Sequence, residues 1–326
     1  MKKSIAFIFP GQGSQKVGMG KDLYNSYSEA KDVFKRVDEA LNQKLSKIIF
    51  DGDENELKLT SNTQPALMAV SLAIIKVLES KIGKKISDFL EIVLGHSLGE
   101  YSSLCSIGSI GLEDTAKILR IRGDAMQNSV KNIKTRMVAV LGLDIEKVEE
   151  KLEELSKDTS FLCEVANDNC PGQVILSGLA SSVDLVEKEF KSIGARSLID
   201  LPVSAPFHCS LMQPASEIMV EALEKLYIQE PKVKFINNVS AEFLSEPGEI
   251  KKKLAEQVCK RVRWRESILK VSQSNIETII EVGSGKVLTG LNKRMKIDKR
   301  FDNISSLDDM EKFLKLYGEK IWKGMF

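Results

Sequence analysis

The amino-acid sequence predicts an α/β protein, with a short parallel sheet covered by helices and an inserted α+β subdomain of ferredoxin-like topology. The parallel sheet is indicated because strand-like apolar runs alternate with helical patterns; the runs cover residues 4–9 and 89–94, and the helical patterns 64–81 and 112–130. The insertion is indicated between about residues 132 and 203, where the order becomes strand, helix, strand, strand, helix, strand.

The first elements have recognisable ends. The run at 4–9 is short and ends at Pro10-Gly11, so we interpret it as a buried strand and not as a secretory signal. The helix at 64–81 has cap candidates at positions 61–63, Pro65 in its first turn and Gly83 after its end.

The later elements divide the chain. Within the insertion we expect strands in MVAVLGL, FLCEVAN, QVILSG and ARSLIDLPV, and helices in EKVEEKLEELSK and SVDLVEKEFKSIG. After it we expect a helix at 210–227, strands near 233–238 and at 276–282, and a helix after Gly285. We therefore predict a large α/β domain from residues 1–131 and 204–326, into which residues 132–203 are inserted.

The composition is that of a soluble globular protein, with 43% hydrophobic and 29% charged residues. A net charge of +1 gives no overall field that would hold the chain on nucleic acid or on an anionic membrane. The longest apolar stretch, ALMAVSLAIIKVL, is interrupted by Lys76 and is too short for a membrane span. We expect a cytoplasmic location, and neither nucleic acid nor membrane as a partner.

Five cysteines are scattered along the chain without a C-x-x-C pair: Cys105, Cys163, Cys170, Cys209 and Cys259. This spacing argues against a disulfide framework and against a zinc site. We expect reduced, structural thiols and no bound metal.

The stretch GHSLGEY at 95–101 has the G-x-S-x-G pattern of a nucleophile elbow. A strand-like run precedes it and a helix-compatible segment follows it, as the elbow requires. The glycines allow a sharp turn, and the helix N-terminus would stabilise a developing oxyanion. This context favours Ser97 as a nucleophile in an α/β-hydrolase-like domain; a tight turn with an ordinary capping serine is the alternative.

A nucleophilic serine needs a base within hydrogen-bond reach, and the chain holds only two histidines. His96 precedes Ser97 on the same turn, where neighbouring side chains diverge. His208, in PVSAPFHCS, is therefore the candidate base, and a purely structural imidazole is the alternative. Cys209 is expected to point away from His208 in an extended segment and to pack in the core.

Arg122 lies on the apolar face of the predicted helix LEDTAKILRIRGDAMQ. The apolar arc consists of Leu112, Ala116, Ile118, Leu119, Ile121, Ala125 and Met126. A buried guanidinium is costly unless it meets an anion. Arg122 should therefore face either an internal carboxylate or a substrate carboxylate that it holds bidentately.

Several blocks together resemble the malonyl-CoA:acyl carrier protein transacylases, in order and along nearly the whole chain. The blocks are FPGQGSQ at 9–15, TQPAL at 63–67, GHSLGEY at 95–101, RG at 122–123, NCPGQV at 169–174, PVSAPFHC at 202–209, NNV at 237–239 and EVGSGKVLTGL at 281–291. The resemblance implies an acyltransferase of fatty acid biosynthesis, which moves malonyl from malonyl-CoA to Ser97 and then to the phosphopantetheine thiol of acyl carrier protein. It implies these two partners and no cofactor.

The resemblance also implies roles for single residues. His208 would act as base and then as acid in each half of a ping-pong mechanism. The backbone N–H groups of Gln12 and Leu98 would form the oxyanion hole, and Arg122 would bind the malonyl carboxylate. A backbone carbonyl near Gln257 would orient the histidine.

Three departures from the family pattern lie near the expected cleft: Lys260-Arg261, Lys134-Thr135-Arg136 and Asp168. They bear on carrier affinity and on the shape of the pocket rim. The basic group Lys260, Arg261, Arg263 and Arg265 would meet an acidic carrier or coenzyme A phosphates, or else form a solvated basic face.

Two other classes of function fit the residues. A Ser-His pair in an α/β domain also serves water, as in a serine thioesterase or esterase of the α/β-hydrolase type. A non-catalytic module that docks a carrier protein through the insertion is the third possibility.

Overall fold

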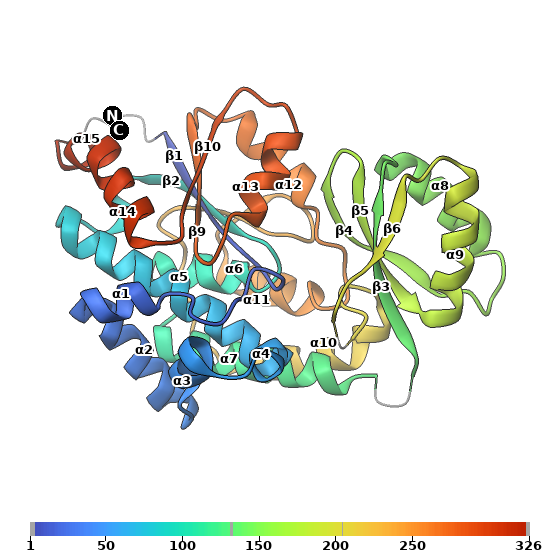
Figure 1. The fold of residues 1–326 in the computed structure, drawn as a ribbon, viewed down its shortest axis with the longest axis horizontal. Coiled ribbons are helices and arrows are strands. Elements are labelled where there is room, and N and C mark those ends of the chain that lie inside the picture. The colour runs from blue at the N-terminus through green and yellow to red at the C-terminus, as the bar shows by residue number, and fades with distance from the viewer. Residues whose placement is uncertain (1–3, 131–132, 204, 324–326) are drawn as a thin grey trace.

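The computed structural model describes residues 4–130, 133–203 and 205–323, and its strands form two separate sheets (Figure 1). The larger sheet has six strands in the order β10-β9-β1-β2-β7-β8. Their bounds are β1 Ile5–Phe9, β2 Leu90–Gly95, β7 Lys234–Ile236, β8 Phe243–Leu244, β9 Thr278–Val282 and β10 Arg300–Ile304. All neighbours are parallel except β7 and β8. The predicted parallel sheet is confirmed.

Strand β1 lies in the middle of this sheet, and all five of its residues are fully buried. Its side chains alternate between two cores. Phe7 and Phe9 belong to the core with α5 (Thr60–Ile82) and α7 (Leu112–Asn128), whereas Ile8 on the opposite face packs with Trp264. A strand covered on both faces is a continuous apolar run, which explains the sequence IAFIF.

Helices cover both faces of the larger sheet (Figure 1). The bounds of the other helices that belong to it are α1 Lys21–Ser26, α2 Ser28–Leu41, α3 Leu45–Asp51, α4 Glu54–Lys58, α6 Gly99–Ser106, α10 Gln213–Glu224, α11 Pro247–Glu256, α12 Trp264–Ser272, α13 Val287–Arg294, α14 Leu307–Phe313 and α15 Glu319–Trp322. Short 3-10 turns lie at Ile86–Asp88 and Ser210–Met212, and a π-helical turn at Leu314–Gly318.

Helix α5 begins at Thr60, earlier than the predicted start at residue 64. The predicted cap candidates lie inside the helix, because their side chains bond to the segment before it. The Asn62 amide donates to the Glu56 carbonyl at 2.8 Å, and the Thr63 hydroxyl donates to the Leu57 carbonyl at 2.6 Å. Gly83 ends the helix in the left-handed conformation, as predicted.

The smaller sheet has four strands in the order β4-β5-β3-β6, and every neighbouring pair is antiparallel. Its elements are β3 Thr135–Leu141, α8 Ile145–Leu155, β4 Cys163–Cys170, β5 Gln173–Leu179, α9 Ala180–Ser192 and β6 Ser197–Asp200. This is the predicted sequence of elements. The helices α8 and α9 lie on the face turned away from the larger sheet, with their own apolar core (Figure 1).

Strand β4 of the smaller sheet contacts helix α12 and the segment just before it. The Asp168 N–H donates to the Val262 carbonyl at 3.0 Å, and the Asp168 carboxylate, only 1% exposed, is bound by Arg265 of α12 at 2.9 Å. Asp168, a departure from the family pattern, is therefore half of a buried ion pair. Arg261 pairs with Glu149 at 2.6 Å, and Arg263, just before α12, pairs with Glu266 in the first turn of that helix at 2.8 Å. The three arginines of the basic group thus already have carboxylate partners.

Removing the arginine of the Asp168–Arg265 ion pair is expected to lower the free energy of unfolding more than removing the carboxylate. Arg265→Met should lower the free energy of unfolding by about 3–5 kcal/mol, because it leaves the Asp168 carboxylate buried without a partner. Asp168→Asn should cost less, since the Arg265 side chain is 23% exposed and can reach water. Urea denaturation measures both values.

The control is Arg263→Met, whose pair with Glu266 has both side chains 34% exposed. It should change stability by about 1 kcal/mol or less. Equal losses for Arg263→Met and Arg265→Met would show that the Asp168 pair contributes no more than a surface pair.

Candidate active site

Ser97 lies on the sharp turn between β2 and α6, with a positive φ of 54°. The turn needs glycine on both sides. A Cβ on Gly95 would come within 1.9 Å of the Gly99 backbone, and a Cβ on Gly99 would come within 2.2 Å of the Phe9 carbonyl oxygen. The Ser97 N–H donates to the Asn238 side chain at 2.8 Å. This strained turn has the geometry of a nucleophile elbow.

Ser97 and His208 lie within hydrogen-bond distance. The serine Oγ is 2.9 Å from Nε2 of His208, and Nδ1 of the same ring donates to the Gln257 backbone carbonyl at 2.7 Å. A carbonyl only accepts, so Nδ1 carries the hydrogen and Nε2 is free to accept from the serine. His208 has a positive φ of 61° and lies in a turn, not in the extended segment that the sequence predicts.

The His208 ring is neutral at physiological pH, so its Nε2 lone pair is available to the serine hydroxyl. Burial, and next to it the positive charge of Arg122, lower the pKa of His208 from 6.5 to about 3. His96 points elsewhere: its Nε2 is 3.0 Å from the side-chain oxygen Oδ1 of Asn169, which accepts, and burial lowers the pKa of His96 to about 4. The structure therefore brings His208, and not His96, to the serine.

Arg122 reaches the same point from α7. Its Nη2 donates to Ser97 Oγ at 3.1 Å and to Gln257 Oε1 at 2.8 Å, and its Nη1 donates to Gln64 Oε1 at 2.8 Å. The side chain is only 1% exposed, so it is buried as predicted, whereas Ile121 of the predicted apolar arc is 40% exposed. Across residues 4–130, 133–203 and 205–323, no carboxylate forms an ion pair with Arg122. Its charge faces neutral acceptors.

Gln12 and Leu98 lie beside the serine, in a cleft of about 160 Å³ that Ser97, Arg122 and His208 also line. The loop at Gly11 touches the elbow: a Cβ there would come within 2.7 Å of the His96 carbonyl oxygen. Among the described residues, no hydrogen-bond acceptor is found for the backbone N–H of Gln12 or Leu98. Both groups are free to bind an oxyanion.

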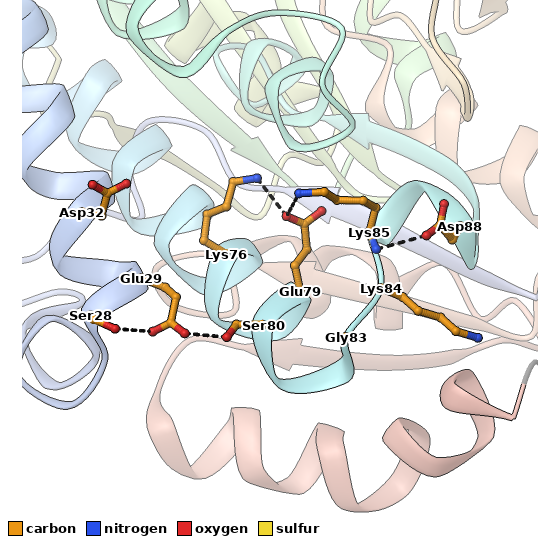
Figure 2. A pocket seen from close by; sticks show the side chains of 10 residues that line it. All are labelled: Ser28, Glu29, Asp32, Lys76, Glu79, Ser80, Gly83, Lys84, Lys85 and Asp88. Carbon is orange, nitrogen blue, oxygen red and sulfur yellow. Dashed lines mark hydrogen bonds and ion pairs between the residues drawn. The ribbon is translucent and has the colours of Figure 1, made fainter.

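A larger groove, of about 750 Å³, lies elsewhere, between α2 and the end of α5 (Figure 2). None of the predicted site residues lines it. Its charged groups bind one another: Lys76 and Lys85 both contact Glu79, and Glu29 accepts from two serines. The two serines of the groove contact only a carboxylate, and no histidine among the described residues lines it, so the smaller cleft with its Ser-His contact is the candidate active site.

Comparison with known proteins decides the family. A family model described as "Acyl transferase domain" matches residues 6–300. The malonyl CoA-acyl carrier protein transacylase of Bacillus subtilis is 44% identical over 305 residues, which are 93% of this chain and 93% of the relative. The chain belongs to the malonyl CoA-acyl carrier protein transacylase family. The resemblance predicted from the sequence is confirmed.

Other members of this transacylase family agree. The Haemophilus influenzae relative is 36% identical, covering 96% of this chain and 99% of its own. A solved acyl-carrier-protein S-malonyltransferase from Bartonella henselae superposes with a TM-score of 0.93 at 46% identity, covering 97% and 99% of the two chains. The complex of a type II PKS acyl-carrier protein with its malonyl-transacylase superposes with a TM-score of 0.91 at 32% identity, and the match covers 96% of this chain and 99% of that chain.

Two residues of this transacylase site were missed by the sequence analysis. Asn238 and Glu100 are fully buried behind Ser97, and the Asn238 amide also donates to the Gly95 carbonyl at 2.8 Å. Both residues belong to blocks that carry the family resemblance, NNV and GHSLGEY. That membership was the only signal, since neither residue stands out by charge pattern or periodicity.

None of the five cysteines lines the candidate cleft. All five thiols are free and buried. Burial raises the pKa of Cys209, the nearest thiol in sequence to His208, to about 11, and its Sγ donates to the Pro206 carbonyl. In the described ranges, no cluster of three metal-binding side chains occurs and no helix has the length and apolarity to cross a membrane.

The acylation step of this transacylase is expected to show no inflection near the ordinary histidine pKa of 6.5. Because the pKa of His208 is lowered to about 3, the ring stays neutral as the pH falls from 7 to 5. We expect kcat/KM for malonyl-CoA to be constant between about pH 5 and pH 7 and to fall only below about pH 4. Rapid-mixing assays across this range measure it. A tenfold loss centred near pH 6.5 would contradict the assignment of a neutral, buried base.

Proposed function

We propose that this chain is an acyl-carrier-protein S-malonyltransferase that works through a Ser97–His208 dyad and a ping-pong mechanism. The observation that carries the proposal is the convergence of a base and a guanidinium on one hydroxyl. Ser97 Oγ lies 2.9 Å from His208 Nε2 and 3.1 Å from Arg122 Nη2. The base and the anion-binding group therefore both contact the nucleophile.

In the first half-reaction, Ser97 Oγ attacks the thioester carbonyl of malonyl-CoA while His208 Nε2 accepts the hydroxyl proton. The backbone N–H groups of Gln12 and Leu98 stabilise the oxyanion of the tetrahedral intermediate. The C–S bond then breaks, His208 returns its proton to the coenzyme A sulfur, and malonyl-Ser97 remains. The second half-reaction repeats these steps with the phosphopantetheine thiol of acyl carrier protein as the attacking group.

Two groups tune this chemistry. The Gln257 backbone carbonyl, at 2.7 Å, holds His208 in the tautomer that accepts from serine, so no acidic third member is needed. Arg122 binds the malonyl carboxylate through its guanidinium, which is buried and lacks an ion-pair partner among the described residues. The substrate carboxylate supplies the missing negative charge. The side chains provide every proton transfer, and we propose no cofactor.

The relatives support both substrates. The Bacillus subtilis and Haemophilus influenzae relatives are both named malonyl CoA-acyl carrier protein transacylase, and one solved neighbour is a malonyl-transacylase in complex with its acyl-carrier protein. These names favour transfer over the esterase alternative. The contact of a serine with a neutral histidine argues against a module that only docks a carrier.

We also propose the finer description of the fold. Of the predicted domains, 1–131 with 204–326 and 132–203, residues 4–130 and 205–323 form an α/β-hydrolase-like catalytic domain, and residues 133–203 form an inserted ferredoxin-like subdomain. The boundary residues 131, 132 and 204 lie outside the described residues. The elbow supports the first description. The strand order β4-β5-β3-β6 with two helices on one face supports the second.

Product analysis tests the proposal. The protein is incubated with malonyl-CoA and either holo acyl carrier protein or the apo form, which lacks the thiol. We expect malonyl-carrier with the holo form, and little free malonate with the apo form. Release of free malonate at equal rates with both carriers would favour a thioesterase and overturn the proposal.

A further inference from the structure

Glu100 is a buried carboxylate one turn behind the nucleophile that the proposed mechanism does not use. It lies in the first turn of α6 and is 0% exposed. Each of its oxygens accepts one hydrogen bond. Oε1 accepts from the Asn238 backbone N–H at 2.6 Å, and Oε2 accepts from the side-chain amide of Gln257.

Gln257 connects this carboxylate to Ser97, Arg122 and His208. Its Nε2 also donates to the Ser97 backbone carbonyl at 2.9 Å, and its Oε1 accepts from Arg122 Nη2 at 2.8 Å. Its own backbone carbonyl accepts from His208 Nδ1 at 2.7 Å. One residue therefore contacts the backbone of the nucleophile, the guanidinium and the base.

The direction in which the Gln257 amide points decides what Arg122 meets. In the observed orientation, the amide NH₂ group faces acceptors, and the amide oxygen faces the guanidinium. A flipped amide would aim NH₂ at Arg122, whose guanidinium has donors only, and its oxygen at the Glu100 carboxylate. Because both of these contacts are repulsive, the Glu100 carboxylate, together with the Ser97 carbonyl and the Arg122 guanidinium, holds the amide in the observed orientation.

We propose that Glu100 is a positioning residue for malonyl selectivity: it fixes the Gln257 amide so that Arg122 is held over Ser97 Oγ. This inference rests on the proposed function, because it concerns how the same site recognises the carboxylate of its substrate. It names a role for Glu100 that acts through Gln257 and not by contact with the substrate.

Burial raises the pKa of the Glu100 carboxyl group to about 8, while the hydrogen bond from the Asn238 N–H, the charge of Arg122 and the Gln257 amide each lower it. The observed hydrogen bonds are those of the ionised form, because each oxygen faces an N–H donor, and the inference concerns that form. One oxygen accepts from the Asn238 N–H and the other accepts from the Gln257 side-chain amide. The arrangement requires a residue with acceptors in both directions.

Glutamine at position 100 cannot meet this requirement. One end of its amide is NH₂, which would face either the Asn238 N–H or the NH₂ group of Gln257. In the first case, the hydrogen bond from the Asn238 N–H, just after β7, is lost. In the second case, Gln257 must turn its own NH₂ group toward Arg122, and the guanidinium moves away from Ser97. The isosteric Glu100→Gln change therefore tests the hydrogen-bond pattern without changing the volume.

The test compares two acyl donors, malonyl-CoA with its carboxylate and acetyl-CoA without one, in the acylation of Ser97. In Glu100→Gln, we expect kcat/KM for malonyl-CoA to fall about tenfold to hundredfold, with a much smaller loss for acetyl-CoA. The matched control is Ser102→Ala on the same helix, where a 1% exposed hydroxyl has no partner among the described residues. It should change neither value.

If Glu100 had a purely structural role, Glu100→Gln would lower kcat/KM for both acyl donors equally. An unchanged malonyl-to-acetyl ratio of kcat/KM in this variant therefore overturns the inference. If thermal unfolding shows that this variant does not fold, the same ratio is measured in Glu100→Asp, which keeps two acceptor oxygens but withdraws them by one methylene. A wild-type ratio there has the same meaning. If the unmodified protein transfers no malonyl, the proposed function fails, and that result is distinct from failure of this inference.

Discussion

Replacing Ser97 by alanine is expected to lower malonyl transfer by at least about 10⁴-fold. The hydroxyl is the only atom of the site that both contacts the base, at 2.9 Å, and occupies the turn where an acyl group would form. Its removal eliminates the acyl-enzyme and leaves the oxyanion donors and Arg122 in place. Residual binding of malonyl-CoA should therefore remain, and calorimetry together with a transfer assay separates binding from chemistry.

The control for Ser97→Ala is again Ser102→Ala, because both remove a buried hydroxyl near the same helix N-terminus. Ser102→Ala should transfer malonyl at the normal rate. His208→Ala should be nearly as slow as Ser97→Ala, since nucleophile and base act as one unit. Normal transfer by Ser97→Ala would revive the interpretation of the chain as a docking module.

Replacing Arg122 by alanine is expected to weaken malonyl use by about 2–5 kcal/mol in kcat/KM and to relax the enzyme toward acetyl-CoA. The reason is that the malonyl carboxylate would lose the buried guanidinium proposed to bind it. The kcat/KM of Arg122→Lys for malonyl-CoA should lie between those of the unmodified protein and Arg122→Ala. Lysine keeps the charge but lacks the planar guanidinium that binds a carboxylate bidentately. Competition between malonyl-CoA and acetyl-CoA measures the selectivity directly.

The matched control is Arg120→Ala, on the same helix but turned toward other partners. Arg120 donates to Asn62 and Gln43 and does not line the cleft. It should leave the malonyl-to-acetyl ratio unchanged. If Arg122→Ala also preserved that ratio, the guanidinium would have only a structural role in the protein.

The sequence was most informative where a local pattern carries the structure. The central strand β1 is apolar at every position because both of its faces are covered, and the elbow needs two glycines because backbone approaches within 2.2 Å of their missing Cβ atoms. Arg122 could be identified because a charge on an apolar helical face is visible by periodicity. These features depend on neighbours in sequence.

The features that sequence reasoning missed depend on partners far apart in the chain. Glu100 meets Gln257 across 157 positions and Asn238 across 138, and no periodicity relates them. In the sequence, Asp168 stands out only as a departure from the family pattern, yet it pairs with Arg265 across 97 positions. The edge strand β10 was not predicted, because its residues are mostly half-buried or exposed and lack a continuous apolar run.

Mapping the acylated residue is the most direct test of the central claim, that neutral His208 activates Ser97 while Arg122 anchors a dicarboxylic acyl group. The protein is incubated with malonyl-CoA alone, digested and sequenced by mass spectrometry, before and after addition of holo acyl carrier protein. We predict a malonyl ester on Ser97 that disappears when the carrier is added. A malonyl group on a cysteine or on another serine, or a Ser97 ester that the carrier cannot discharge, would contradict the account.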